Sequence, residues 1–305
     1  MLLRRTISSA TLVGSELLFG THSVAAALAS GSRTFERVTI QLGDDARGDA
    51  VRGARALAPW FRARRIPVVR AERSVLDALA RGGTHQGVVA HVSTLALPEA
   101  VDGLDPSSVT REGAGPPVLL ALDGITDPQN VGAIMRTALL LGVDGIVLPK
   151  HGGAPVNATL SKTSAGALEV LAAASRVSIT RSLPTFLGAA AAAGWRVLAA
   201  GGSASGGREA TSAALPIECS WETLSRDAPT VLVLGSEGAG LSSAARNACT
   251  AFVNVPMSLD TVLSTCAQRG GDTSGTAPSL PPLPILDSFN VSVAAALLLS
   301  KLTAR

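Results

Sequence analysis

The residues best suited to chemistry lie near the middle of this 305-residue chain. Asn130 and Arg136 stand six residues apart in the stretch DGITDPQNVGAIMRTA, and the residues around Arg136 are mostly apolar. An arginine among so many apolar neighbours indicates a specific task. Its planar guanidinium suits the recognition of phosphate and guanine. We therefore interpret this polar cluster as one wall of a binding site.

Glu237 lies in a second informative stretch, the glycine-rich loop of VLVLGSEGAG. Glycines let a backbone approach a ligand closely, and the N–H groups at the start of a following helix are free to donate. The loop does not match the dinucleotide fingerprint G-x-G-x-x-G, and the chain has no phosphate-binding motif G-x-x-x-x-G-K-[ST]. We therefore expect a loop that holds a neutral or cationic nucleoside through backbone amides and carbonyls.

A third polar group precedes the last apolar stretch of the chain, in DSFNVSVA. Ser288 or Asn290 could cap the helix that follows. Capping explains one polar residue, but it does not explain Asp287, Ser288 and Asn290 together. This group is therefore a further candidate for the site.

The elements that must position these side chains follow from the hydrophobic pattern. Residues 118–122 predict a buried strand, and residues 129–141 predict a helix after turns at Asp123-Gly124 and Asp127-Pro128. Asn130 then falls in the first helical turn and Arg136 about two turns later, so the two need not share a face. A polar cluster between a strand and a helix is the usual place for a site in an open α/β sheet.

Strands and helices alternate from residue 118 onward, which predicts a mostly parallel sheet covered on both faces. Strands are predicted over 145–148, 176–179, 195–199, 230–234 and 251–255, and helices over 158–173, 184–193, 242–248 and 291–302. The segment between Met257 and Asp287 is rich in Ser, Thr, Gly and Pro, and its second half reads as an unstructured loop.

A smaller α/β unit is predicted before a linker over 98–117, which is rich in Pro, Gly and acidic residues. Its expected elements are a turn and helix over 15–30, strands over 38–42, 67–69 and 87–92, and helices over 46–65 and 75–80. The helix over 46–65 carries six arginines. These arginines could contact RNA phosphates or form a plain solvated face, and both readings stay open.

Composition permits a nucleic-acid partner without demanding one. The formal net charge is +3 and the pI about 9.1. Nearly all the positive charge is arginine, a bias that a GC-rich genome also produces. Tyrosine is absent, which argues against aromatic base-stacking platforms. No apolar run reaches the length of about 20 residues that a membrane helix needs.

Cysteine and histidine give no pattern of a metal site. The cysteines, at positions 219, 249 and 266, form neither a CxxC motif nor a cluster with histidine, so we expect neither zinc nor disulfides. His85 and His91 are close in sequence but lack metal-ligand spacing, and we interpret them as structural.

Three stretches, in this order and spacing, resemble the signature motifs of the SpoU (TrmH-like) RNA ribose 2'-O-methyltransferases of the SPOUT class. They are DGITDPQNVGAIMRTA, VLGSEGAGLS, and the pair VPM and DSFNVSVAAALLL. The stretches SELLFGTHSVAAAL and THQGVVAHV are similar to the small substrate-binding domain of bacterial and mitochondrial large-subunit rRNA guanosine 2'-O-methyltransferases. The resemblance covers the chain except residues 1–14 and the segment around 258–286.

The resemblance implies a parallel-sheet α/β methyltransferase domain over 118–305 that ends in a trefoil knot and binds S-adenosylmethionine. A small ribosomal-protein-like α/β domain over 15–97 would bind RNA, joined by the linker over 98–117. Similar enzymes are homodimers, whose active site is completed near the subunit interface. No metal is expected.

The resemblance also implies roles for individual residues. The catalytic set falls on Asn130, Arg136, Glu237, Ser288 and Asn290. The cofactor-binding set falls on Leu234, Gly235, Val255, Met257, Phe289, Asn290 and Ala294. Leucine is usual in the family where this chain has Phe289, and a larger apolar side chain should be tolerated there because the contact is largely through backbone.

The larger departure is an insertion of 29 residues, 258–286, between the two halves of the third motif. We expect a tolerated surface loop. A retained intron and an insertion that impairs the pocket are the alternatives.

The expected function is 2'-O-methylation of a guanosine in large-subunit rRNA. Residues 1–14 have the composition of a transit peptide, which favours the mitochondrion over the cytoplasm. A non-catalytic RNA-binding protein of the same fold and a tRNA 2'-O-methyltransferase are the alternatives. A nicotinamide dehydrogenase is disfavoured because its fingerprint is missing.

Overall fold

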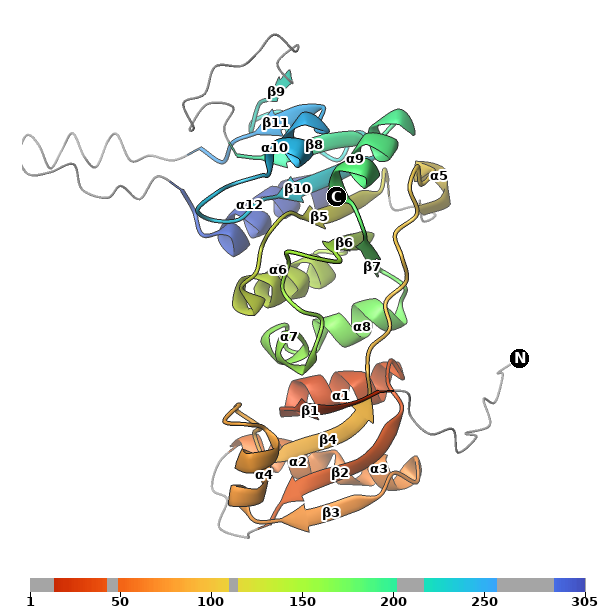
Figure 1. Cartoon of the computed structure of the whole chain (residues 1–305), viewed down its shortest axis with the longest axis vertical. Coiled ribbons are helices and arrows are strands. Elements are labelled where there is room, and N and C mark those ends of the chain that lie inside the picture. The colour runs from red at the N-terminus through yellow and green to blue at the C-terminus, as the bar shows by residue number, and fades with distance from the viewer. Residues whose placement is uncertain (1–13, 43–48, 110–114, 202–216, 257–287, 305) are drawn as a thin grey trace, which may run out of the picture.

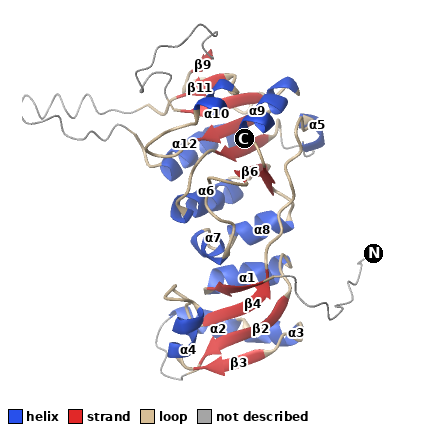
Figure 2. Cartoon of the chain, viewed as in Figure 1, coloured by secondary structure: helices blue, strands red, loops and turns tan. Residues whose placement is uncertain are grey.

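The computed structural model describes residues 14–42, 49–109, 115–201, 217–256 and 288–304. Their strands form two separate sheets (Figure 2), which belong to two units stacked along the longest axis of the molecule (Figure 1). We call them the N-terminal unit, residues 14–93, and the C-terminal unit, residues 115–304. No helix in these ranges is long and apolar enough to cross a membrane.

The N-terminal unit is a four-stranded sheet with the order β1-β4-β2-β3, in which only β2 and β3 run parallel. Its strands are β1 (Ser15–Phe19), β2 (Phe35–Gln41), β3 (Val68–Ala71) and β4 (Val88–Ser93). Its helices are α1 (Thr21–Ser30), α2 (Asp49–Ala56), α3 (Ala58–Ala63) and α4 (Arg73–Leu79). One core cluster joins the sheet to α1 and α3, and a smaller one lies beneath α4.

Two expectations for this unit were wrong. The turn predicted at the start of 15–30 is strand β1, which pairs antiparallel with β4. The single helix predicted over 46–65 is split into α2 and α3 around Leu57. Pro59 at the start of α3 explains the split, because proline has no N–H to bond the preceding turn. The side chains of Arg52, Arg55, Arg62, Arg64 and Arg65 are all exposed, as either reading of that surface requires.

His85 is structural, as predicted. The ring is buried, its Nε2 lies 3.0 Å from Asp77 Oδ1, and its Nδ1 accepts from the Gly87 N–H at 3.0 Å. Both ring nitrogens are therefore occupied by the protein itself. Within the described ranges, no group of three His, Cys, Asp or Glu side chains could hold a metal ion.

The C-terminal unit confirms the predicted doubly covered parallel sheet. All its strand pairs are parallel, in the order β7-β6-β5-β10-β8-β11-β9. The strands are β5 (Val118–Leu122), β6 (Gly145–Pro149), β7 (Val177–Thr180), β8 (Arg196–Ala200), β9 (Ile217–Cys219), β10 (Thr230–Leu234) and β11 (Ala251–Val253). The helices are α6 (Pro128–Leu140), α7 (Ala158–Thr163), α8 (Ala167–Ala173), α9 (Leu183–Ala192), α10 (Ser243–Asn247) and α12 (Val291–Thr303).

The sheet is covered differently on its two faces. Alternate residues of β5 enter two core clusters, Leu120 with α6, α8 and α12, and Leu119 with α9 and α10. The helix predicted over 158–173 is broken into α7 and α8 because Ala165 and Gly166 both have positive φ, 51° and 85°. The knot stays a prediction, since residues 257–287, which connect β11 to α12, lie outside the described ranges.

The segment predicted as a linker lies against the C-terminal sheet. Pro98 and Ala100 exchange backbone hydrogen bonds with Ile179 of β7, both 2.9 Å long. The Trp195 indole donates to the Leu104 carbonyl at 2.7 Å, just before the short helix α5 (Pro106–Val109). The polypeptide between the units is therefore fastened to the second sheet.

Direct contacts also join the two units. Helix α1 packs on α8, and β1 packs on α7 (Figure 1). At this contact Arg33 is fully buried between two carboxylates, Glu169 from α8 and Glu16 from β1. Ser23 of α1 also donates to the Ser161 carbonyl of α7 at 3.2 Å.

Candidate active site

The candidate site lies where β5 and β10 are neighbours. The chain leaves β5 through α6 on one face of the sheet, and it leaves β10 through α10 on the other face. The loops after the two strands therefore diverge, which opens the crevice where ligands bind in doubly wound sheets. Both predicted polar stretches, at Asn130 and at Glu237, follow these two strands.

Local sequence fixes the start of α6. The Asp127 carboxylate caps the helix by accepting from the Gln129 N–H at 2.9 Å, and Pro128 follows in the first turn, where its missing N–H costs nothing. Asn130 therefore stands at the amino end of the helix, close to the end of β5.

Asn130, Glu237 and Asn290 are joined by hydrogen bonds, although up to 160 residues separate them. The Asn130 amide donates to Glu237 Oε1 at 3.2 Å, and the Asn290 amide donates to Asn130 Oδ1 at 3.1 Å. The Asn290 amide also donates to Glu237 Oε1. The three predicted residues thus form one closed cluster contributed by three separate segments.

The start of α12 completes this cluster. Asn290 caps the helix, as the sequence suggested, by accepting from the Ser292 N–H at 2.9 Å. The first helical N–H, that of Val291, donates to Glu237 Oε1 at 3.2 Å. A carboxylate at a helix amino end is stabilised by the helix dipole. Since these bonds all converge on Oε1, the second carboxylate oxygen of Glu237 accepts no hydrogen bond from the described residues.

The loop after β10 is folded tightly on itself. Ser236 and Gly240 exchange backbone hydrogen bonds of 3.0 and 2.9 Å. Gly235 fits because it has no side chain: a Cβ there would lie 2.3 Å from the carbonyl carbon of Gly240 and 2.5 Å from Leu241 N. The glycine is therefore required by close backbone approach.

Arg136 does not join the cluster. Asn130 faces Glu237 and Asn290, whereas Arg136 and Gln129 line a cavity between the two units. Within one chain Asn130 and Glu237 do not contact Arg136 through hydrogen bonds, and Arg136 makes no hydrogen bond or ion pair with any described residue. Helical geometry gives the reason, since six residues place the two side chains about 120° apart around the axis.

The predicted cofactor residues lie at the carboxyl ends of strands and at the start of α12. Leu234 ends β10 and Gly235 follows it, the half-buried Val255 follows β11, and Ala294 lies one turn into α12. Phe289 precedes α12 and is 39% exposed. Ser288 stands beside it and is exposed, whereas Met257 lies outside the described residues.

Sequence reasoning missed the role of Asp123, which it treated only as a turn residue. The Asp123 carboxylate accepts from the Ser242 N–H at 2.6 Å, and its own N–H donates to the Leu234 carbonyl at 2.8 Å. It therefore ties the loop after β5 to the loop after β10. A carboxylate directly after a buried strand was the available signal.

The chain matches two family models. The model of the SpoU rRNA methylase family matches residues 117–262, and the model of the RNA 2'-O ribose methyltransferase substrate-binding domain matches residues 17–98. The first match ends at residue 262, shortly after the predicted insertion begins. The two matches fall on the C-terminal and N-terminal units, respectively.

Individual relatives agree with the models. The chain is 34% identical to human mitochondrial rRNA methyltransferase 1 over 93% of this chain and 71% of that protein. It is 34% identical to the 23S rRNA (guanosine-2'-O-)-methyltransferase RlmB of Pseudomonas aeruginosa over 79% of this chain and 87% of that protein.

A solved structure shows the same fold. The AdoMet-bound rRNA methyltransferase from Sinorhizobium meliloti superposes with a TM-score of 0.61 at 21% identity, over 94% of this chain and 86% of that one. With two family models in the expected order and relatives matched over most of their length, the chain belongs to the SpoU rRNA methylase family.

Proposed function

We propose that the protein transfers the methyl group of S-adenosylmethionine to a ribose 2'-hydroxyl in RNA. The observation that carries this proposal is the closed cluster of Asn130, Glu237 and Asn290 at the diverging loops of β5 and β10. The C-terminal unit would perform the transfer, and the domain predicted over residues 15–97, which contains the N-terminal unit, would bind the RNA.

The residues present suit the cofactor, whose sulfonium supplies an already activated methyl group. Backbone amides and carbonyls near Gly235 can bind a nucleoside, and the apolar Leu234, Val255 and Ala294 can contact its uncharged parts. Phe289 belongs to the same proposed wall, and Met257, outside the described residues, stays a cofactor residue implied by the resemblance alone. Glu237 places a negative charge near the cation. Asn290 shapes the pocket by fixing the start of α12.

The remaining task is to orient the ribose and to help its hydroxyl lose a proton. We assign this task to Arg136, in contact with the hydroxyl and an adjacent phosphate. Arginine stays protonated in proteins, so a role as base requires an unusual environment. In the alternative, Arg136 positions the ribose while phosphate or water takes the proton. Asn130, Glu237 and Ser288 hold the substrate.

A homodimer would complete the site. Arg136 is directed away from the cluster in its own chain, so a second copy would be needed to bring an arginine to it. In support, the exposed apolar residues Leu140 of α6 and Val293 of α12, 76% and 45% exposed, lie on the two helices that carry site residues. Oligomeric state in solution tests this part.

The proposed substrate is a guanosine of large-subunit rRNA, and the proposed compartment is the mitochondrion. The names of the human and Schizosaccharomyces pombe relatives, both mitochondrial rRNA methyltransferase 1, support the compartment, and the RlmB relatives support the guanosine. The transit-like composition of residues 1–14 agrees. A fluorescent fusion of the full chain tests localisation, and a cytoplasmic signal would contradict it.

The deciding experiment maps 2'-O-methyl sites in RNA from cells with and without the gene, alongside binding of labelled S-adenosylmethionine to purified protein. We expect saturable cofactor binding and loss of one rRNA mark. A lost tRNA mark with rRNA unchanged would refute the substrate. No binding at saturating cofactor would favour a non-catalytic RNA-binding protein, the rival that the insertion over 258–286 favours.

A further inference from the structure

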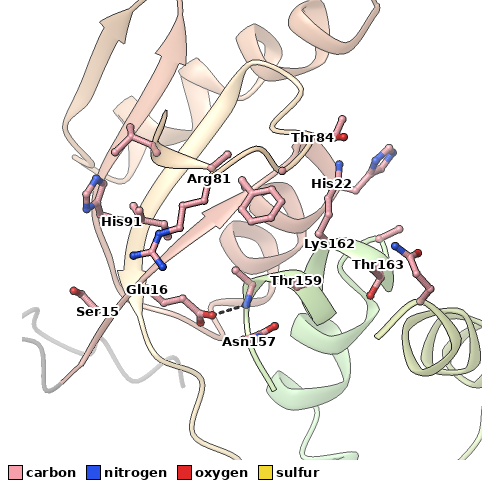
Figure 3. Close-up of a pocket in the computed structure, with 18 of the residues that line it drawn as sticks. Ser15, Glu16, His22, Arg81, Thr84, His91, Asn157, Thr159, Lys162 and Thr163 are labelled. Carbon is pink, nitrogen blue, oxygen red and sulfur yellow. Dashed lines mark hydrogen bonds between the residues drawn. The ribbon is translucent and has the colours of Figure 1, made fainter. Parts of the chain in front are cut away.

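A large cavity lies between the two units. Its volume is about 1050 Å³, above the roughly 300–1,000 Å³ of small-molecule pockets. The N-terminal unit contributes β1, His91 of β4 and the end of α4, and the C-terminal unit contributes α7 (Figure 3). Arg136 of α6 also lines the cavity. The cavity therefore extends from β1 and the end of α4 to the predicted catalytic arginine.

The lining of this cavity is cationic. It includes Arg81, Arg136 and Lys162, and its one acidic side chain is Glu16. Glu16 is already engaged, because Oε2 lies 2.6 Å from the buried Arg33 guanidinium and Oε1 accepts from the Ala158 N–H. Of the described residues that line it, three are thus cations, and none is a carboxylate available to neutralise them.

Lys162 is held rigidly relative to the helix that carries Arg136. Its helix, α7, packs directly against α6, where a Cβ on Gly132 would lie 2.4 Å from Thr163 Oγ1. The Thr163 hydroxyl donates to the Pro128 carbonyl at 2.7 Å. Among the described residues, Lys162 Nζ donates only to the neutral Gln86 Oε1, at 2.5 Å. Burial lowers the pKa of this ammonium, so an anion in the cavity would stabilise its charged form.

Arg81 faces the same cavity from the N-terminal unit. It follows α4 in the left-handed conformation, with φ of 48°, at a position where helices usually place glycine. Gly82 and Gly83 come immediately after it. Its side chain has no hydrogen-bond or ion-pair partner among the described residues. The positive φ fixes where the chain turns after α4, and Arg81 stands at this turn with its side chain in the cavity.

We propose that this cavity holds the RNA backbone beside the target nucleotide, with Arg81 and Lys162 each contacting a phosphate and Arg136 next to the ribose. The amides and hydroxyls of Gln129, Asn157 and Thr159 supply donors for further phosphate and sugar oxygens. The proposal rests on the proposed function and adds the path of the strand to it. Arg81 and Lys162 are positioning residues, and neither touches the methyl group.

The test measures binding of an rRNA fragment containing the target loop by fluorescence anisotropy, from about 50 to 200 mM salt. The variants are Arg81→Gly and Lys162→Gln. Arg73→Ala is the matched control, because Arg73 lies on the same helix α4, is 75% exposed and does not line the cavity. Thermal unfolding and affinity for S-adenosylmethionine are measured on every variant.

We expect each cavity variant to bind RNA about tenfold more weakly, with the salt slope reduced by about 1, while affinity for S-adenosylmethionine is unchanged. Arg81→Gly should also raise the melting temperature, because glycine relieves the strained φ. If Arg81→Gly makes the protein more stable but weakens RNA binding, the loss of affinity cannot result from damage to the fold, and Arg81 has a role in ligand binding.

RNA affinity of Arg81→Gly equal to that of the parent chain would overturn the proposal, as would an equal loss in Arg73→Ala. Either result leaves methylation by the parent chain intact, so the proposed function would survive. Conversely, the parent chain could bind RNA in a way that depends on Arg81 and yet transfer no methyl group. That result would refute the proposed function but would support the proposal that the cavity binds RNA.

Discussion

At the scale of single residues, Glu237 links the segments of the site. One carboxylate oxygen receives the amides of Asn130 and Asn290 and the first N–H of α12. These bonds fix the positions of three chain segments relative to one another without involving Arg136. The residue proposed to act on the ribose therefore differs from the residues that hold the pocket together. Loss of catalysis and loss of cofactor binding should therefore be separable by mutation.

Replacing Arg136 with Ala should lower kcat by at least about 100-fold, the size of effect seen when a donor to developing charge is removed. Affinity for S-adenosylmethionine should stay within about twofold, because Arg136 makes no contact with the Asn130 cluster. Single-turnover methylation and equilibrium cofactor binding on the same preparation measure both. Near-normal turnover would show that another group deals with the hydroxyl.

Cys249 gives a prediction on pH. Burial, helped by the charge of Asp123, raises the pKa of its thiol from 9.0 to about 12. Between these values the folded state keeps a proton that the unfolded state loses, so stability falls as pH rises above about 9. Replacing Cys249 with Ala should make the fall of melting temperature between about pH 8 and 10.5 shallower. Parallel curves for variant and parent would contradict this.

At the scale of elements, sequence predicted what hydrophobic period and chain order determine. Residues 118–122 and 230–234 were predicted as strands with the bounds that β5 and β10 have. Breaks were missed where one residue overrides the period, as at Pro59 and at Ala165. The three-residue strand β9 was also missed, because it pairs only at the sheet edge and is too short for any periodicity.

The residues of the candidate site likewise fall into those that the sequence predicted and those that it did not. Motifs located Asn130, Glu237 and Asn290, which the structure joins, because such motifs record residue type and order. Arg81 and Lys162 escaped notice, since what sets them apart is a positive φ, a shared cavity and the lack of a carboxylate partner. None of these properties is visible in a linear sequence.

The loop after β10 should be sensitive at one glycine and tolerant at another. A Cβ on Gly235 would meet the backbone of Gly240 and Leu241, which cannot move without breaking the loop, whereas one on Gly238 would meet nothing within 4 Å. Gly235→Ala should cost about 1–3 kcal/mol of stability and weaken cofactor binding. Gly238→Ala should have the same stability and the same cofactor affinity as the parent chain. Denaturant unfolding measures the stability, and calorimetry measures the affinity. Equal effects of the two substitutions would show that the loop can shift to accommodate a side chain at Gly235.

Deleting residues 258–286 tests whether the insertion is tolerated. The hydrogen bonds of the cluster join Asn130, Glu237 and Asn290 to one another, and all three residues lie outside this segment. We therefore expect the shortened chain to bind S-adenosylmethionine and methylate RNA within about threefold of the parent, since long surface insertions change stability little. Methylation assays on both chains measure this. A more than tenfold increase in methylation rate on deletion would show that the insertion impairs the active site.

At the scale of the whole molecule, the two units are joined by a buried ion-pair network. Arg33 Nε donates to Glu169 Oε1 at 2.9 Å and its Nη1 donates to Glu16 Oε2 at 2.6 Å. The side chains of Arg33 and Glu169 are fully buried. This network lies beside the proposed RNA cavity, because Glu16 also lines it. It therefore sets the distance between the two walls that RNA would touch.

Replacing Arg33 with Met leaves Glu169 buried without its partner, which should cost about 3–5 kcal/mol. Arg181→Ala is the control, because it breaks an ion pair with Glu99 whose side chains are 74% and 60% exposed, and such pairs contribute about 0–1 kcal/mol. Denaturant unfolding of both variants compares the two costs.

The double variant Arg33→Met with Glu169→Met distinguishes a buried charge from lost packing. It should lose less stability than the sum of the single variants, since Glu169 is then not left buried without Arg33, whereas the partly exposed Glu16 loses its partner in both the single Arg33 variant and the double variant. Its RNA affinity should nevertheless fall, because the polar clamp that fixes the cavity walls is gone. Additive losses of stability would instead mean that Arg33 and Glu169 act independently.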